Sequence, residues 1–558
     1  MSSVFAAWLG TNYCPTEDEV QDIRAFLAES QARVDSLNEA IAKLQEERDK
    51  LMEHITAHQV LCAPIRRLPP DVLRELFAQC LPVGRNCAMS AREGPILLGR
   101  ICSSWRSLVR HTPELWSRLH VVEPPLSTWY GAVSHRIQSA KVQQRLQAIK
   151  LWLDRAGSLP LSISFQRDGE RGTNSATMTR NNSTLLPFLA SYVPRCTSLH
   201  LDCPAVLFDE LAHIPSEQRV IIEDITLQGG WSIDRTSSWE TLRVLESPTL
   251  RRLTLAFYEC IVQMERLPVN WVHLTFLKIR DPFTSGLGHK AKISKVLSGC
   301  FNLRTCVLEL CDSDDIGTGL GGTVAIPPSK AVLPHLQHLQ LSTDFSLLPH
   351  LVLPSLRHLI LQREDDGYAP PRDDCLLDNI QHILPTLASS PRLETLRCAL
   401  KLPDDSLMDL LAALPSTLLT LELVDNPADP QLDDPALEYI AKSGCYPELH
   451  TLQLRKCESI SEEGIIAFLQ LQVTSNLREL HIEYDTGIVP PRRPGADALA
   501  QQLQPFRAAG TEIRVTRRRT GMSMVFSPFS GMSHLLTKAE REAFFELGSS
   551  GPEEIIDD

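Results

Sequence analysis

Hydrophobic residues recur with seven-residue spacing over residues 16–62, which is the pattern of a coiled-coil helix. Thr16 and Glu19 have the spacing of a capping box at its start, and Ala63-Pro64 ends it because proline disfavours a helical residue before it. We therefore predict one long helix that self-associates or binds a partner helix; packing onto its own chain is the alternative. Arg48 and His58 interrupt the apolar seam and are candidates for setting its register. The apolar seam residues are Val20, Ile23, Leu27, Val34, Leu37, Ile41, Leu44, Leu51, Ile55 and Cys62.

A different pattern, apolar-x-x-apolar-x-apolar, returns from Trp116 to the last copy near Val515. From Leu201 to Val515 its step averages about 28 residues, which lies in the range of leucine-rich repeats. Each short repeat needs its neighbours to bury its apolar residues, so the pattern predicts a stacked solenoid with a parallel sheet. The last two apolar residues of each copy should point into the core. Clear copies include Cys196/Leu199/Leu201, Leu250/Leu253/Leu255, Leu274/Leu277/Ile279, Leu336/Leu339/Leu341, Leu356/Leu359/Leu361 and Leu449/Leu452/Leu454.

The residues beside those apolar positions should form the open, concave face of the sheet, where solenoids bind partners. We interpret this face as the binding surface for a protein substrate. Histidines occur on it, but each lies in a different repeat and no metal-ligand spacing recurs, so we expect no metal site. The insertions 281–290, 312–328 and 363–374 are expected to be loops or partner contacts. The substrate-face candidates are Arg252, Phe276, Lys278, Arg280, His338, His358, Arg397 and Arg455.

A short helical module is predicted between the long helix and the repeats, over residues 63–119. It opens with Leu68-Pro69 and a helix that carries Leu76-Phe77, with proline in the first turn. We expect Val72, Leu73, Leu76 and Phe77 on one face of this helix. A second helix is predicted over 95–109, because Leu98, Ile101, Trp105 and Leu108 have helical spacing. Leu115-Trp116 follows.

These anchors, in this order, resemble the F-box, and most closely the large F-box family of mushroom-type fungi, in which such a helix precedes the box. The resemblance implies a small helical module that docks on the Skp adaptor of a cullin–RING ubiquitin ligase. Residues 83–93 depart from the family pattern, which has a short turn there. The family's adaptor-contacting positions match Leu68, Pro69, Leu76, Phe77, Leu98 and Trp105.

Composition narrows the function. The 558 residues are 43% hydrophobic and 22% charged, as in ordinary globular proteins, and the net charge of −13 argues against nucleic-acid binding. No C-x-x-C pair occurs among the 15 cysteines, and neither a secretory signal nor a membrane span is evident. We expect an intracellular protein, of the cytoplasm and/or nucleus, with reduced and buried cysteines.

Enzyme chemistry is not expected, and neither is a cofactor. The stretch 317–322 matches G-x-G-x-x-G, but Pro327-Pro328 follow where the dinucleotide-binding fingerprint needs a helix. No Walker A, H-E-x-x-H or G-x-S-x-G motif occurs in the sequence. We therefore expect a binding protein without a catalytic constellation.

The expected fold is α/β. It comprises a flexible N-terminus (1–15), a coiled-coil helix (16–62), a helical F-box (63–119), a leucine-rich-repeat-like solenoid (120–520) and a partly disordered C-terminal tail (521–558). The resemblance implies a substrate-recognition subunit of a Skp–cullin–F-box ubiquitin ligase in the ubiquitin-conjugation pathway. The alternative is a scaffold protein outside any ligase that uses the coiled coil and the repeats for assembly.

Overall fold

The chain forms two compact units, 1–76 and 77–558, whose boundary falls inside helix α2 (Pro70–Gln79). The computed structural model describes residues 4–123, 132–167, 185–204, 207–208, 210–211, 220–229, 242–257, 264–281, 289–310, 330–342, 345–362, 380–400, 402, 406–425, 430–442, 446–471, 476–485, 496–518 and 553–554.

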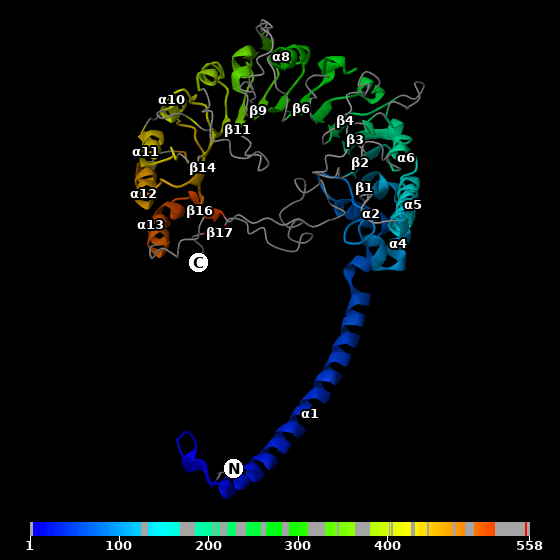
Figure 1. Ribbon diagram of the computed structural model, residues 1–558, viewed down its shortest axis with the longest axis vertical. Coiled ribbons are helices and arrows are strands. Elements are labelled where there is room, and N and C mark those ends of the chain that lie inside the picture. The colour runs from blue at the N-terminus through cyan, green and yellow to red at the C-terminus, as the bar shows by residue number, and fades with distance from the viewer. Residues whose placement is uncertain are drawn as a thin grey trace. The chain divides into compact units, whose positions relative to one another are not determined.

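The first unit is dominated by α1 (Glu17–Cys62), one continuous helix of 46 residues (Figure 1). The predicted capping box starts it: Thr16 N donates to Glu19 Oε2 at 2.8 Å, and Glu19 N donates to Thr16 Oγ1 at 3.4 Å. The helix ends at Cys62, directly before Ala63-Pro64. The predicted long helix is thus present with its expected start and end. Two 3-10 turns flank it, η1 (Ala6–Trp8) and η2 (Pro64–Arg67).

The second unit begins with short helical elements. The prediction of one helix over 95–109 is wrong, because the chain is extended at Cys102 (φ −154°, ψ 170°). The Cys102 thiol accepts a hydrogen bond from Trp105 N at 3.5 Å, so this residue caps a new helix. The expected common face is consequently divided: Leu98 is buried, whereas Ile101 is 57% exposed. The elements are α3 (Leu98–Ile101), α4 (Ser103–Arg110) and η3 (Pro113–Trp116).

A 15-stranded sheet then follows chain order, parallel throughout except for its last pair, in which β17 runs antiparallel to β16. A small separate sheet pairs β8 (Ala331–Val332) with β10 (Leu351–Val352). The strands of the large sheet are β1 (Arg118–Glu123), β2 (Leu161–Arg167), β3 (Cys196–Asp202), β4 (Asp224–Gln228), β5 (Arg252–Ala256), β6 (Phe276–Asp281), β7 (Thr305–Leu310), β9 (His338–Ser342), β11 (His358–Gln362), β12 (Thr395–Ala399), β13 (Thr420–Val424), β14 (Thr451–Cys457), β15 (Glu479–Asp485), β16 (Glu512–Arg518) and β17 (Glu553–Glu554).

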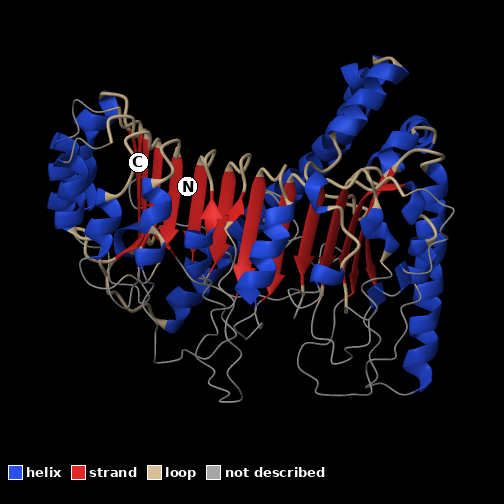
Figure 2. Ribbon diagram, turned by 90° about the horizontal axis from the view of Figure 1, so that it is seen from above, coloured by secondary structure: helices blue, strands red, loops and turns tan. Residues whose placement is uncertain are grey.

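Helices and 3-10 turns connect the strands and lie along the outer face of the curved sheet, whose strands line the inner side (Figures 1 and 2). The helices are α5 (Ala132–Arg155), α6 (Leu186–Ala190), α8 (His289–Gly299), α9 (Leu384–Ala388), α10 (Ser406–Ala412), α11 (Asp434–Lys442), α12 (Glu462–Leu471) and α13 (Ala496–Ala508). The 3-10 turns are η5 (Val193–Arg195), η8 (Arg243–Glu246), η9 (Met264–Arg266), η10 (Trp271–His273), η11 (Phe345–His350) and η12 (Ile380–His382).

The core runs between the sheet and the outer helices. The strand register stacks like positions of successive repeats, so that Leu253 lies opposite Leu277 and Leu277 lies opposite Cys306. The next inward position stacks Ile279 on Leu308 in the same way, and all of these side chains are fully buried. The prediction that the last two apolar residues of each copy point inward is confirmed. The unit is a leucine-rich-repeat-like solenoid.

Some sequence predictions fall outside the described residues. These are the insertions over 312–328 and 363–374, most of 281–290, the glycine-rich stretch 317–322, and the tail 521–558 apart from β17. Among the helices that the structure describes, none combines the length and the apolar character needed to cross a bilayer.

Candidate functional site

The open face of the solenoid sheet carries three parallel rows of side chains. Because strand residues alternate between the two faces, the positions between the buried ones point away from the core. The register places Arg252 beside Phe276 and, further along, His338 beside His358 in one row. All predicted substrate-face residues lie in these rows. The second row contains Lys278 and Arg397, and the third contains Arg280 and Arg455.

Arg252 links an acidic and an aromatic neighbour. Its Nε lies 3.3 Å from Asp224 Oδ2, and its guanidinium carbon lies 4.2 Å from the centre of the Phe276 ring. Burial raises the pKa of the Asp224 carboxyl, and the nearby Arg252 charge opposes that rise. The guanidinium of Arg252 therefore stacks on the Phe276 ring in a cation–π contact, which holds both groups in place on the open face.

Glu309 is shared by two cations of the neighbouring strand. Its Oε1 lies 2.5 Å from Lys278 Nζ, and its Oε2 lies 3.6 Å from Arg280 Nε. The carboxylate is buried, whereas the two cations are partly exposed. This trio carries a net positive charge, held in position by its central acid.

A similar trio lies further along the sheet. Glu422 Oε1 is 2.9 Å from Arg455 Nε and 3.5 Å from Arg397 Nε. Both arginine side chains remain more than one-third exposed, at 35% and 37%. The register also places Glu483 beside Arg455, so two guanidinium groups and two carboxylates alternate on this part of the open face.

Two histidines stack between these trios. The rings of His338 and His358 are 4.2 Å apart at an interplanar angle of 5°. Burial lowers the pKa of His358, and the neighbouring His338 and Arg357 lower it further, against the effect of Glu394. Burial and Arg455 likewise lower the pKa of His481, whose Nε2 lies 3.0 Å from Thr516 Oγ1. The imidazoles of His358 and His481 therefore favour the neutral form.

The open face presents cations, carboxylates, an aromatic ring and imidazoles that neighbouring side chains already position. Within the part of the chain that the structure describes, no group of three or more His, Cys, Asp or Glu residues could hold a metal ion.

The predicted adaptor anchors divide into two kinds on α2 and the segment before it. Leu68 is partly exposed, Pro69 is exposed, and Leu76 is 40% exposed. Val72, one turn before Leu76, is exposed to 44%. The opposite helix face carries buried residues, including Phe77. Sequence reasoning placed Val72 and Phe77 on one face, but the i, i+4 spacing of Val72 and Leu76 marks the exposed stripe.

Phe77 belongs to the core of the second unit. It is 1% exposed, and its ring lies 4.7 Å from that of Trp105. Leu98 is buried as well, and Trp105 is half-buried. The last anchor, Trp116, donates from Nε1 to Val109 O at 2.8 Å. These residues therefore pack the module together, and their exposed area is small.

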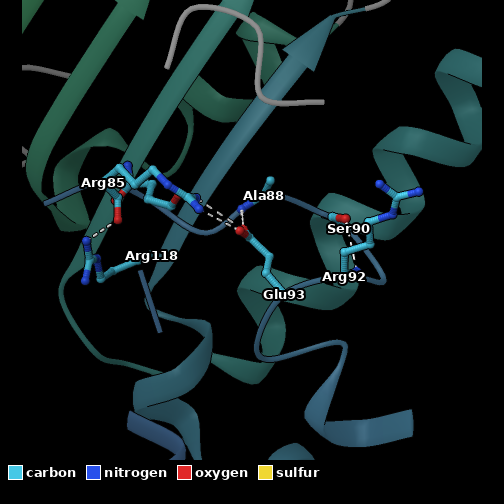
Figure 3. A network of polar contacts seen from close by, with 7 residues as sticks. Arg85, Ala88, Ser90, Arg92, Glu93 and Arg118 are labelled. Atoms are coloured by element: carbon cyan, nitrogen blue, oxygen red, sulfur yellow. Dashed lines mark hydrogen bonds and ion pairs between the residues drawn. The ribbon is translucent and has the colours of Figure 1, made fainter. Parts of the chain in front are cut away.

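The insertion over 83–93 folds back onto the first strand of the sheet (Figure 3). Arg85 Nη2 binds Glu93 Oε2 at 2.8 Å, and both side chains are buried. Glu93 also accepts a hydrogen bond from Ala88 N, and Arg118 of β1 donates to Arg85 O. We expected this segment to depart from the family geometry; the structure shows it as an ordered connection.

This segment also covers the edge of β1. Ala88 forms a parallel bridge with His120, and His120 N donates to Cys87 O at 2.8 Å. Asn86 Oδ1 accepts from Ser162 Oγ of β2 at 2.8 Å. An open strand edge can pair with other chains, so this cover protects the start of the sheet. Sequence reasoning missed this role, for which the signal was a polar, charged insertion inside the module that precedes the repeat array.

The cysteines are more varied than predicted. The repeat cysteines that the structure describes are buried, as is Cys87 of the helical module. Burial raises the pKa of the Cys87, Cys196 and Cys300 thiols to about 12. Cys14, Cys62 and Cys80 are exposed, so the expectation of buried cysteines is wrong for these three. The buried thiols stay protonated and unreactive at neutral pH.

Comparisons with known proteins give a likeness of fold only. Neither the scan of protein-family models nor the search of curated proteins gives a match. Among solved structures, the chain is similar to the Rad7 and Elc1 complex of yeast, with 13% identity, a TM-score of 0.33, and coverage of 78% of this chain and 95% of that one. It is also similar to a protein from Bacteroides fragilis, with 11% identity, a TM-score of 0.26, and coverage of 69% of this chain and 82% of that one.

Proposed function

We propose that this protein is a substrate-recognition subunit of a Skp–cullin–F-box ubiquitin ligase. One observation carries the proposal: Val72 and Leu76 form an exposed apolar stripe on α2, directly after the partly exposed Leu68 and the exposed Pro69. The F-box resemblance puts adaptor contacts at Leu68, Pro69 and Leu76 of this segment, and the exposure of Val72 adds it to them.

The stripe has the character of a binding surface. Val72 and Leu76 lie one turn apart and are 44% and 40% exposed, while the opposite side of the same helix is buried. Apolar area removed from water contributes about 25 cal/mol per Å², so a docked adaptor would gain from covering these side chains. In this proposal Phe77 and Leu98 pack the module, and Leu68, Pro69, Val72 and Leu76 contact the adaptor.

The repeat face supplies the second half of the function. A target held on the rows of Arg252, Lys278 and Arg397 would be tethered to the ligase through the same chain. Tethering raises the effective concentration of target lysines near the conjugating enzyme, so the chain itself needs no catalytic residue. The excess of cations around Glu309 favours a target with acidic side chains.

The test is calorimetric titration of the full-length chain with a purified Skp adaptor. Truncating a central apolar anchor usually costs about 2 kcal/mol or more, so Val72→Ala with Leu76→Ala should weaken binding at least about tenfold. Leu68→Ala with Pro69→Ala should do the same. Leu151→Ala is the matched control, because Leu151 is 56% exposed on α5, in the repeats.

Circular dichroism of each variant should match that of the unsubstituted chain, because the altered side chains are exposed. Weaker adaptor binding by the Val72/Leu76 variant and by the Leu68/Pro69 variant, with the control unchanged, would support the ligase role. Equal affinities in all variants, or no adaptor binding by the unsubstituted chain, would reject the docking surface. The scaffold alternative would then be favoured.

A further inference from the structure

Helix α1 carries a solvent-exposed apolar seam along nearly its whole length. Assigning Val20 as an a position puts the interruptions Arg48 at a, and Ser30 and His58 at d. A seam this long needs a partner, and the pattern of its interruptions restricts which partner and which orientation it accepts. The exposed seam residues are Leu27, Val34, Leu37, Ile41, Leu44, Leu51 and Ile55, each at least 47% exposed.

A parallel pairing with a second copy fits this pattern badly. Parallel helices place each a position against the same a position of the partner. Arg48 would then face Arg48 of the second copy inside the seam, where like charges repel and must be desolvated. In the single chain, the Arg48 guanidinium is exposed and its Nε donates to Asp49 Oδ1 at 2.9 Å.

An antiparallel pairing removes that conflict. Antiparallel helices place a positions against d positions, and a two-fold axis beside Glu39 aligns the two copies over the full helix. Arg48 then faces Ser30, a polar seam position that can hydrogen-bond a guanidinium, while His58 faces Val20 at the end of the helix. A shift by one heptad would instead place Arg48 against Leu37 or Ile23. The layers are Val20 on His58, Leu27 on Leu51, Val34 on Leu44, Ile41 on Leu37, Ile55 on Ile23 and Arg48 on Ser30.

The flanking charges agree with the same register. Arg33 and Glu47 occupy g positions, and in antiparallel pairs g faces g. The axis beside Glu39 brings Arg33 of each copy beside Glu47 of the other, so the symmetry makes the pair twice. In a parallel dimer Arg33 would face Asn38 and Glu47 would face Met52, with no charge complement.

We propose that α1 pairs with α1 of a second copy in an antiparallel coiled coil centred on Glu39. Each chain continues from Cys62, so the two copies leave the rod at opposite ends. For a helix of 46 residues, these ends are separated by about 70 Å. The proposal is independent of adaptor binding.

The first test is disulfide crosslinking of the full-length chain. The exposed Cys14, Cys62 and Cys80 are replaced by serine, and Leu27→Cys and Leu51→Cys are made in separate chains with different tags. On mixing and mild oxidation, the antiparallel register should link the Leu27→Cys chain to the Leu51→Cys chain. Disulfides within each preparation instead would show a parallel pair and overturn the proposal.

The second test exchanges the flanking charges in the full-length chain. Arg33→Glu would place like charges together twice, which should weaken self-association roughly five- to tenfold by sedimentation equilibrium. Glu47→Arg added to the same chain should restore it, because the pair is then reversed. Leu151→Ala is the control for an unrelated exposed side chain. A monomer at high micromolar concentration, or an Arg33→Glu chain that associates normally, would overturn the proposal.

Discussion

Glu93 holds the guanidinium of Arg85 inside the protein, with 2.8 Å between Glu93 Oε2 and Arg85 Nη2. The two side chains are 7% and 1% exposed. The same carboxylate accepts a hydrogen bond from Ala88 N, in the segment that bridges to His120 of β1. The pair therefore fixes the segment that covers the first strand. Because both groups are shielded from water, each charge is stabilised by the other and not by solvent.

We predict that Glu93→Gln destabilises the second unit strongly. Removing one member of a buried ion pair leaves the other charge unpaired and typically costs about 3–5 kcal/mol. The denaturant midpoint of the chain should fall. Glu46→Gln is the control, because Glu46 pairs with Lys50 while both are about 70% exposed, and it should change little. Matching midpoints for the two variants would contradict a structural role of the buried pair.

Phe77 and Val72 should separate folding from binding. Phe77→Ala leaves a cavity beside Trp105 and should lower stability by about 3–5 kcal/mol. Val72→Ala removes an exposed side chain and should leave the thermal transition nearly unchanged while weakening adaptor binding. Differential scanning calorimetry with adaptor titration distinguishes them. A stable Phe77→Ala chain would contradict its assignment to the core.

Gly464 is a third test, because it lies against Asp434. A Cβ at Gly464 would come within 2.0 Å of Asp434 Oδ1, which also accepts from Ser461 N at 2.9 Å. Gly464→Ala must therefore displace the carboxylate that holds the start of α12, and we expect a loss of about 1–3 kcal/mol. Gly299→Ala is the matched control, because its Cβ would meet only Trp271 Cβ at an ordinary 3.5 Å. Equal thermal transitions for both variants would contradict this account.

The repeat strands were predictable because their periodicity and burial agree. Leu277 and Ile279 are fully buried, as the apolar-x-x-apolar-x-apolar pattern requires, and each neighbouring repeat repeats the same environment. The rows of open-face residues were also predictable, because successive side chains of a strand point to opposite faces of the sheet. The open-face ion pairs did not follow, because Glu309 contacts Lys278 only through a register between strands some 30 residues apart.

The helical module was less predictable. The apolar spacing of Leu98 and Trp105 fits one helix, but the Cys102 thiol offers a local cap that breaks it. The ordered conformation of 83–93, a segment that departs from the family pattern, did not follow from the sequence either, because it depends on the mutual pairing that buries Arg85 and Glu93. In both places a specific capping or tertiary bond overrides the average preference that a local pattern reports.

The stacked histidines predict a pH dependence of the open face. The pKa of His358 is lowered in the folded chain, first by burial and then by His338. The unfolded chain therefore binds more protons at mildly acidic pH. The contribution of His358 to stability is complete above the ordinary histidine value of 6.5 and is lost as the pH falls below it.

His338→Gln should raise the pKa of His358 part of the way towards 6.5, measured by NMR titration of isotope-labelled histidines. His111→Gln is the control, because His111 is exposed on the helical module and should leave the titration of His358 unchanged. An unchanged pKa of His358 in the His338→Gln chain would show that the stacked ring of His338 has no electrostatic effect on it.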